Sequence, residues 1–189
     1  MTSLIVLIGP VGVGKSTTAR LLADHLQLPH YALDELRWTY FAEIGYNARH
    51  QQQIWETQGM AGVLAYWEPF EVYALERILA EHDAGVIDVG GGYTIATDPP
   101  RATRVRAILA PYPNVILLLP TPHVDESVHV LAERLTGYLP DHFPLQTHVQ
   151  QHFGTQDLAK MVVYTHTKAP ETIRDEIVGF LRSQTRTHR

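Results

Sequence analysis

Short apolar runs alternate with longer amphipathic stretches along the chain. The apolar runs have the length of buried strands and lie at residues 4–8, 30–33, 85–89, 115–119 and 161–164. Between them, apolar side chains recur three and four residues apart, which is the spacing of one helical face. The final helix starts near Pro170 and places Ile173, Ile177 and Leu181 on one face. Strands that alternate with helices predict an α/β fold, with a parallel sheet covered by helices on both sides.

The helical stretches differ in length. Residues 16–26, 98–110 and 125–136 have the length of single helices, whereas residues 35–82 form one long helical region. We expect breaks in that region at residues 45–47 and again near Gly59 and Gly62. Its many aromatic side chains indicate core packing or the lining of a cleft. Residues 137–156 are polar and contain glycine and proline, so we expect turns there.

A glycine-rich motif follows the first strand directly and opens the first helix. It fits the pattern G-x-x-x-x-G-K-[ST] and consists of Gly9, Pro10, Val11, Gly12, Val13, Gly14, Lys15, Ser16 and Thr17. Backbone amides of such a loop cradle phosphate oxygens, and the helix N-terminus adds positive potential at the same place. Lys15 is expected to reach the β- and γ-phosphates, and Ser16 to bind Mg²⁺. A plain glycine-rich turn is the alternative, but the strand–loop–helix context favours a nucleoside triphosphate site.

Polar or glycine residues also end the second and third strands. Ligands of parallel sheets bind at the carboxyl ends of the strands, so Asp34, Asp88 and Gly90–Gly92 should surround the same cleft as the loop. Asp34 is a candidate catalytic carboxylate for a substrate hydroxyl, or alternatively an N-cap for the helix starting at Glu35. Asp88 is a candidate Mg²⁺ ligand, or alternatively a carboxylate with a local partner. Residues 90–92 allow a ligand close to the backbone, or form a plain tight turn.

The amino-acid composition argues against several classes of protein and of binding site. The chain has 189 residues, which favours one domain, and a net charge of -5, which argues against nucleic-acid binding. It has no cysteine, so disulfides and thiolate zinc sites are excluded. No apolar run is long enough to span a membrane. We expect a cytoplasmic protein, monomeric or homodimeric, that binds a small molecule and neither nucleic acid nor a membrane.

Several of these motifs together resemble shikimate kinase. They are the loop at residues 9–17, Leu-Pro before the second strand, Asp34, Val-Ile-x-x-Gly-Gly-Gly at 86–92, Val-Ile-Leu-Leu-Leu at 115–119, Ala-Glu-Arg-Leu at 132–135 and the ending at 162–181. The resemblance implies a three-layer α/β/α fold with a five-stranded parallel sheet, and phosphoryl transfer from ATP with Mg²⁺. It also implies a substrate-binding helical segment at about 35–82 and a lid segment at about 136–158. Asp34 would bind the substrate hydroxyl, and Arg134 would pack on adenine.

The chain departs from this family at the acceptor side of the site. The family has Phe-Arg where this chain has Phe70-Glu71, and the first acid of its Asp-x-Asp is Ala32 here. No Lys or Arg occurs between Leu135 and Ala159, although the family's lid carries arginines. Those arginines pair with a substrate carboxylate, which a glutamate would repel. We therefore expect Phe70, Glu71 and Gly90–Gly92 to bind an acceptor other than shikimate, either neutral or cationic.

Histidines replace cations in the lid segment. His148 and His152 lie one helical turn apart, and His142 precedes them. This spacing is compatible with metal ligation, but a third ligand of matching spacing is lacking, so a solvated polar face is the preferred interpretation. Alternatively, these histidines contact phosphates when the lid closes, which would make activity sensitive to pH near neutrality.

Three functions are compatible with these motifs. The first is a kinase that phosphorylates a hydroxyl of a small metabolite. The second is an ATP-binding module, or a slow NTPase, that acts through a partner, because a lid without arginine has less positive charge for the transition state. A nucleic-acid-dependent ATPase is the third, and the negative net charge counts against it.

Overall fold

A parallel sheet with strand order β2-β3-β1-β4-β5 forms the centre of the molecule. The structure is a computed structural model that describes residues 4–95, 98–140 and 143–187. Its strands are β1 (Leu4–Ile8), β2 (His30–Ala32), β3 (Gly85–Asp88), β4 (Val115–Leu119) and β5 (Met161–Tyr164). Every neighbouring pair is parallel. The predicted α/β fold with a five-stranded parallel sheet is thus confirmed.

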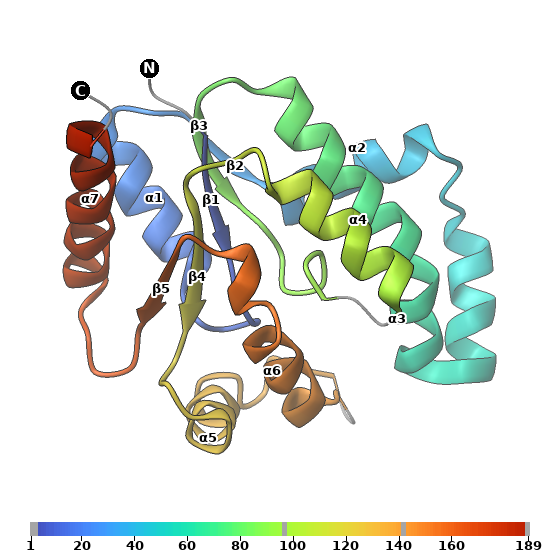
Figure 1. The fold of residues 1–189 in the computed structure, drawn as a ribbon. Coiled ribbons are helices and arrows are strands. Elements are labelled where there is room, and N and C mark those ends of the chain that lie inside the picture. Colours follow the sequence, from blue (N-terminus) through green and yellow to red (C-terminus); the bar gives the residue numbers. More distant parts are fainter. Residues whose placement is uncertain (1–3, 96–97, 141–142, 188–189) are drawn as a thin grey trace.

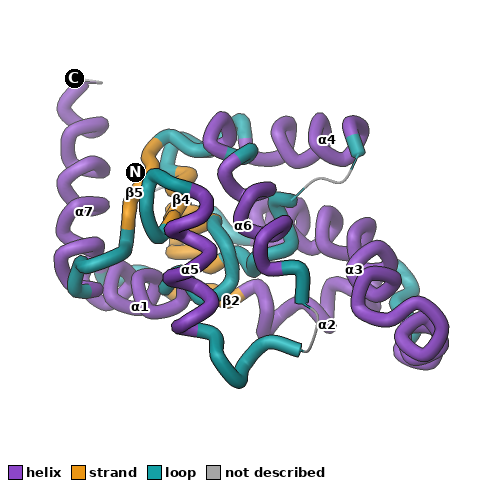
Figure 2. Tube along the Cα trace, turned by 90° about the horizontal axis from the view of Figure 1, so that it is seen from below, coloured by secondary structure: helices purple, strands orange, loops and turns teal. Residues whose placement is uncertain are grey.

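The helices cover both faces of the sheet and its carboxyl end. They are α1 (Lys15–Leu26), α2 (Leu33–Glu43), α3 (Ala48–Glu81), α4 (Pro99–Leu109), α5 (Val124–Arg134), α6 (Leu145–Phe153) and α7 (Pro170–Thr187). Helices α1 and α7 lie on one side, and α2, α3 and α4 on the other (Figure 1). The strand arrows point toward α5 and α6, which lie across the carboxyl end and are seen from below in Figure 2.

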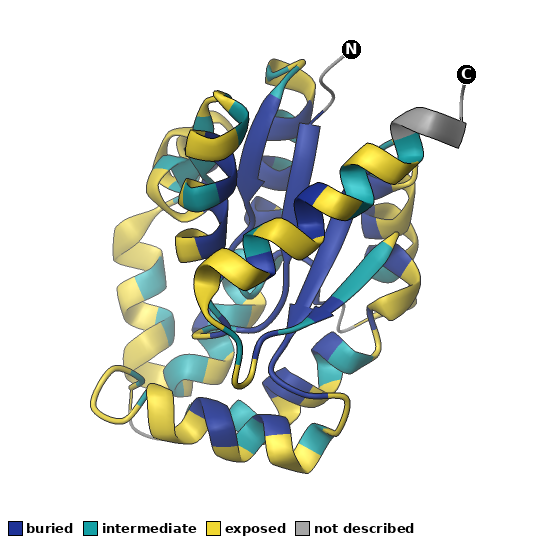
Figure 3. Ribbon diagram, turned by 90° about the vertical axis from the view of Figure 1, so that its left-hand side faces the viewer, coloured by how far each residue is buried: buried dark blue, intermediate teal, exposed yellow. Residues whose placement is uncertain are grey.

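Alternating side chains of β1 divide the core into two layers. Leu4, Val6 and Ile8 pack with α3 and α4, whereas Ile5 and Leu7 pack with α1 and α7. A strand points successive side chains to opposite faces, so a continuous apolar run is what a strand covered on both sides requires. Figure 3 shows the buried strands between helices whose outer faces are exposed. No helix among the described residues is both long and apolar enough to cross a membrane.

The long helical region breaks close to the expected positions. Helix α2 ends at Glu43, and Asn47 caps α3 by accepting hydrogen bonds from the backbone amides of Arg49 and His50. Within α3, Gly59 has φ 65° and ψ -157°, which bends the chain, whereas Gly62 lies within the helix. Residues 48–58 therefore project away from the sheet as an arm (Figure 1).

Two local predictions were wrong. The second strand ends at Ala32, and α2 begins at Leu33, so Asp34 lies in the first turn of α2 and does not cap a helix from Glu35. Residues 137–156 contain the helix α6, where turns were expected. Val149 of α6 is fully buried in the core, and this packing stabilises the helix. The helix was not predicted because its sequence is mostly polar.

Candidate active site

The glycine-rich loop connects β1 to α1 at the carboxyl end of the sheet. Gly9, Gly12 and Gly14 have positive φ values of 141°, 76° and 103°. A Cβ at Gly9 would overlap the carbonyl oxygen of Leu118 in β4, and one at Gly12 would overlap the side chain of Leu135. The loop conformation therefore requires glycine for both backbone and steric reasons. Helix α1 begins directly after Gly14, so its N-terminus faces the loop.

Lys15 lies folded against this loop. Its side chain is buried, and Nζ donates to the carbonyl oxygens of Gly9 at 2.9 Å and Pro10 at 3.0 Å. Burial lowers the pKa of Lys15, and the negative charges of Asp88 and Asp34 oppose this shift. Asp34 and Asp88 thus both act electrostatically on the loop lysine, because all three groups lie at the carboxyl end of the sheet.

Ser16 and Asp88 form an oxygen-rich corner beside Lys15. Strand register places Asp88 of β3 opposite Leu7 of β1, next to the start of the loop. Burial raises the pKa of Asp88, while a hydrogen bond with Ser16 and the charge of Lys15 oppose the rise. A hydroxyl and a carboxylate oxygen suit Mg²⁺, which uses few protein ligands together with phosphates and water. Among the described residues, no group of three or more His, Cys, Asp or Glu that could hold a metal ion occurs.

A cavity of about 500 Å³ opens next to the loop, between α2, α3, α6 and the segment after β3. This volume is within the range of small-molecule pockets. Apolar wall comes from Leu64, Trp67 and Ile95, and Val11 of the loop lines the same space. Gly91 and Gly92 also line the cavity, whereas Gly90 does not. A largely apolar cavity thus lies directly beside the glycine-rich loop.

Asp34 lines this cavity together with Arg37. The guanidinium of Arg37 lies 3.6 Å from the Asp34 carboxylate and is held over the rings of Trp38 and Trp67, at 4.5 and 5.0 Å from their centroids. A Cβ at Gly90 would collide with the Asp34 carboxylate, so Gly90 makes room for this acid. Arg37 was not predicted as a site residue, because a single basic residue in a helix forms no recognisable sequence motif.

Glu71 forms a buried ion pair on the cavity wall. Arg101 of α4 contacts Glu71 at 3.0 Å and Glu68 at 3.0 Å, and it donates to the carbonyl oxygen of Gly92 at 3.3 Å. Burial raises the pKa of Glu71 to about 7, and the adjacent guanidinium opposes the rise. Arg101 is thirty positions away from Glu71 in the sequence, and no sequence motif indicated that it belongs to the site. Phe70 does not line the cavity; it packs against Phe41, in the aromatic core.

The histidines of α6 are not solvated, which corrects the preferred interpretation of the sequence. His148 is 8% exposed, and its Nε2 accepts a hydrogen bond from the backbone amide of Val11 at 3.1 Å. His152 is fully buried, and its Nε2 donates to the carbonyl oxygen of Gly91 at 2.8 Å. Both side chains therefore fasten α6 to the active-site loops. His142 lies outside the described residues.

Arg134 and Thr17 lie on the exposed rim of the loop region. Arg134 is the last residue of α5, and the next residue, Leu135, reaches Gly12. Thr17 lies in the first turn of α1 and is exposed. The adenine contact of Arg134 stays a prediction.

Comparison with known proteins identifies shikimate kinases and a gluconokinase as similar to this chain. No protein-family model matches the chain. A shikimate kinase of Streptomyces coelicolor is 30% identical over 171 residues, which cover 90% of each chain. The solved shikimate kinase of Acinetobacter baumannii has a TM-score of 0.63 at 20% identity and covers 97% of this chain and 95% of its own. A gluconokinase structure from Sinorhizobium meliloti has a TM-score of 0.58 at 16% identity over 98% and 94% of the chains. This chain is a small-molecule kinase that belongs to the shikimate kinase family.

Proposed function

We propose that this kinase transfers the γ-phosphoryl group of ATP to a hydroxyl of a small metabolite that is neutral or cationic, and that shikimate is not its preferred acceptor. The observation that carries this proposal is the contact of Arg101 with two carboxylates, Glu68 and Glu71, at 3.0 Å each. A guanidinium recognises a substrate carboxylate by a bidentate contact, and this one is already engaged.

The second arginine of the cavity supports the same acceptor class. Arg37 faces the Asp34 carboxylate at 3.6 Å and is stacked on two tryptophan rings. The acids lining the cavity are Asp34, Glu68 and Glu71, and they outnumber the arginines. An anionic acceptor would meet these acids, whereas a neutral or cationic molecule with an apolar body would complement both the charge and the apolar wall.

The donor side supports ATP with Mg²⁺. The loop amides and the N-terminus of α1 are positioned to bind phosphate oxygens, and Lys15 would turn from the carbonyl oxygens of Gly9 and Pro10 toward the phosphates. Ser16 and Asp88 would hold the cation, which would neutralise charge on the transferred group. Asp34 would accept a hydrogen bond from the acceptor hydroxyl and orient it for in-line attack.

A screen of acceptors tests this proposal. The purified protein is incubated with ATP and Mg²⁺ and with nucleosides, neutral polyols, amino sugars and sugar acids, and phosphoesters are detected by mass spectrometry. We expect a phosphoester from a neutral or cationic member and none from the Lys15→Ala variant. Phosphorylation restricted to carboxylate-bearing members would contradict the proposed acceptor class, and no phosphoester at all would contradict the proposed transfer.

A further inference from the structure

One side chain of the lid segment reaches the phosphate loop directly. Nε2 of His148 lies 3.1 Å from the backbone nitrogen of Val11, although the two residues are 137 positions apart. The imidazole also approaches Gly91, where an added Cβ would lie 3.2 Å from both Cε1 and Nε2. His148 therefore lies between the loop that cradles phosphate and the backbone that lines the acceptor cavity.

The hydrogen-bond partner of His148, the backbone amide of Val11, indicates the role of this contact. Backbone amides of a G-x-x-x-x-G-K-[ST] loop donate to phosphate oxygens, and Val11 belongs to this loop. An atom that accepts from this amide occupies a position suited to a phosphate oxygen. Since Nε2 accepts, the imidazole is the neutral tautomer with its proton on Nδ1. When a phosphate oxygen takes over the Val11 amide, Nε2 lies within reach of that oxygen and lacks its former donor.

A second histidine fixes the position of the first. His152, one turn further along α6, donates from Nε2 to the carbonyl oxygen of Gly91 at 2.8 Å, and its ring lies 4.8 Å from that of His148. Val149, between them in sequence, is fully buried in the core. His152 is thus a positioning residue, since it holds α6 while His148 faces the loop.

The charges around His148 favour a change of protonation when phosphate binds. Burial and the positive charge of Lys15 lower the pKa of His148 to about 4. His152 and Phe143 of the lid segment also contact His148, and the charged residues that line the same cavity are Asp34, Arg37, Glu68, Glu71 and Arg101. Bound phosphates add several negative charges next to the imidazole, and an opposite charge at this distance raises a histidine pKa.

We propose that His148 is a phosphate-contacting residue of this kinase: without nucleotide it accepts from the Val11 amide, and with a triphosphate bound it becomes protonated and donates from Nε2 to the terminal phosphoryl oxygens. It rests on the nucleotide binding of the proposed function. His148 thereby supplies a positive charge that the lid segment otherwise lacks. The sequence from Leu135 to Ala159 contains no Lys or Arg.

Two measurements test this assignment. In the first, ¹⁵N NMR of the imidazoles in the wild-type protein follows the pKa of His148, without nucleotide and with Mg²⁺ and a non-hydrolysable ATP analogue. We expect the pKa to rise by about two or more pH units on binding, as a new ion pair requires. A pKa that stays unchanged in the saturated complex would overturn the proposal, and this result does not depend on how any variant folds.

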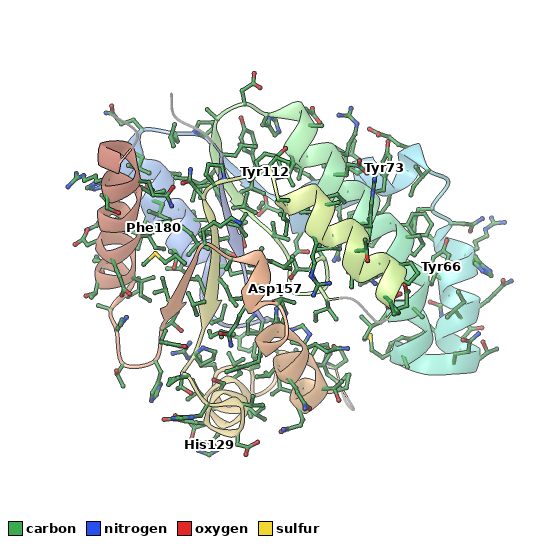
Figure 4. The ribbon with its side chains drawn as sticks, viewed as in Figure 1. Tyr66, Tyr73, Tyr112, His129, Asp157 and Phe180 are labelled. Atoms are coloured by element: carbon green, nitrogen blue, oxygen red, sulfur yellow. The ribbon has the colours of Figure 1, made fainter. Side chains whose placement is uncertain are left out.

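In the second, affinity for the same analogue is measured from pH 5.5 to 8.5 for the wild type, His148→Gln and the control His129→Gln. His129 lies on the outer side of α5 (Figure 4), and its side chain is 76% exposed. We expect His148→Gln to lose about tenfold in affinity at pH 6 and less at pH 8, because a charge-assisted hydrogen bond is lost. Equal pH profiles for both variants would overturn the role of His148. Absence of binding by the wild type would instead refute the proposed function beneath it.

Discussion

Arg101 and Glu71 form an ion pair of 3.0 Å in which both side chains are at least 90% buried, directly beside Gly92. The pair joins α4 to α3 and supports the glycine backbone that lines the acceptor cavity. Arg101 also contacts Glu68, so a cation that is distant in sequence partly neutralises two acids of the cavity wall.

Removal of the buried cation should destabilise the protein strongly. Arg101→Met leaves the Glu71 carboxylate buried without its cation, so we expect the free energy of unfolding to fall by about 3 kcal/mol in urea titrations. Arg104→Met breaks the exposed ion pair with Glu76 and should cost less than about 1 kcal/mol. Arg101→Met combined with Glu71→Gln should recover part of the loss. Equal effects of the two single variants would contradict the structural role of the buried pair.

Truncation of the loop lysine should remove nucleotide binding. Lys15→Ala deletes the ammonium group that neighbours Asp88 and Asp34, and we expect affinity for Mg²⁺ and an ATP analogue to fall on the order of a hundredfold. Calorimetric titration measures this effect, and circular dichroism checks that the variant is folded. Lys160→Ala, in an exposed position, is the control and should bind as the wild type does.

Addition of one methyl group at Gly90 should disturb Asp34, the carboxylate that we propose orients the acceptor hydroxyl. The new Cβ would collide with the carboxylate of Asp34 and approach the ring of Tyr93, so Asp34 must move. We expect kcat/KM for the acceptor to fall on the order of a hundredfold while nucleotide affinity is retained. Gly179→Ala, in the interior of α7 with open space around it, should leave activity unchanged and stabilise the protein by about 0.5–1 kcal/mol. If Gly90→Ala kept full activity, Asp34 would not need its present position.

Acid should loosen α6. The folded-state pKa of His148 lies at about 4, below the ordinary value of 6.5, so the folded protein binds fewer protons than the unfolded chain between these values. The stabilisation is therefore fully present above pH 6.5 and is lost as the pH falls toward 4. We expect the free energy of unfolding to drop by about 1.5 kcal/mol between pH 6.5 and 5 through this residue. The drop should be smaller in His148→Gln, and hydrogen exchange should locate the change in α6.

The sequence was sufficient for features that depend on local spacing. The loop at residues 9–17 combines fixed glycines with a strand and a helix start, and the strands are continuous apolar runs, so both were predicted in place. Helix α6 was not predicted because polar residues surround its few buried positions. Its histidines are explained by contacts with Val11 of the loop and with Gly91 after β3, which are distant in sequence. Arg101 escaped because its partner Glu71 is distant in sequence, and tertiary packing alone brings them together.

A comparison of matched acceptors tests the central claim most directly. Shikimate and its methyl ester differ by one negative charge at the same ring, as do gluconate and a neutral hexose alcohol of the same chain length. The value of kcat/KM for ATP-dependent phosphorylation is measured for both members of each pair. We expect the neutral member of each pair to have the higher kcat/KM. A clear preference for the carboxylates would contradict the proposed acceptor class.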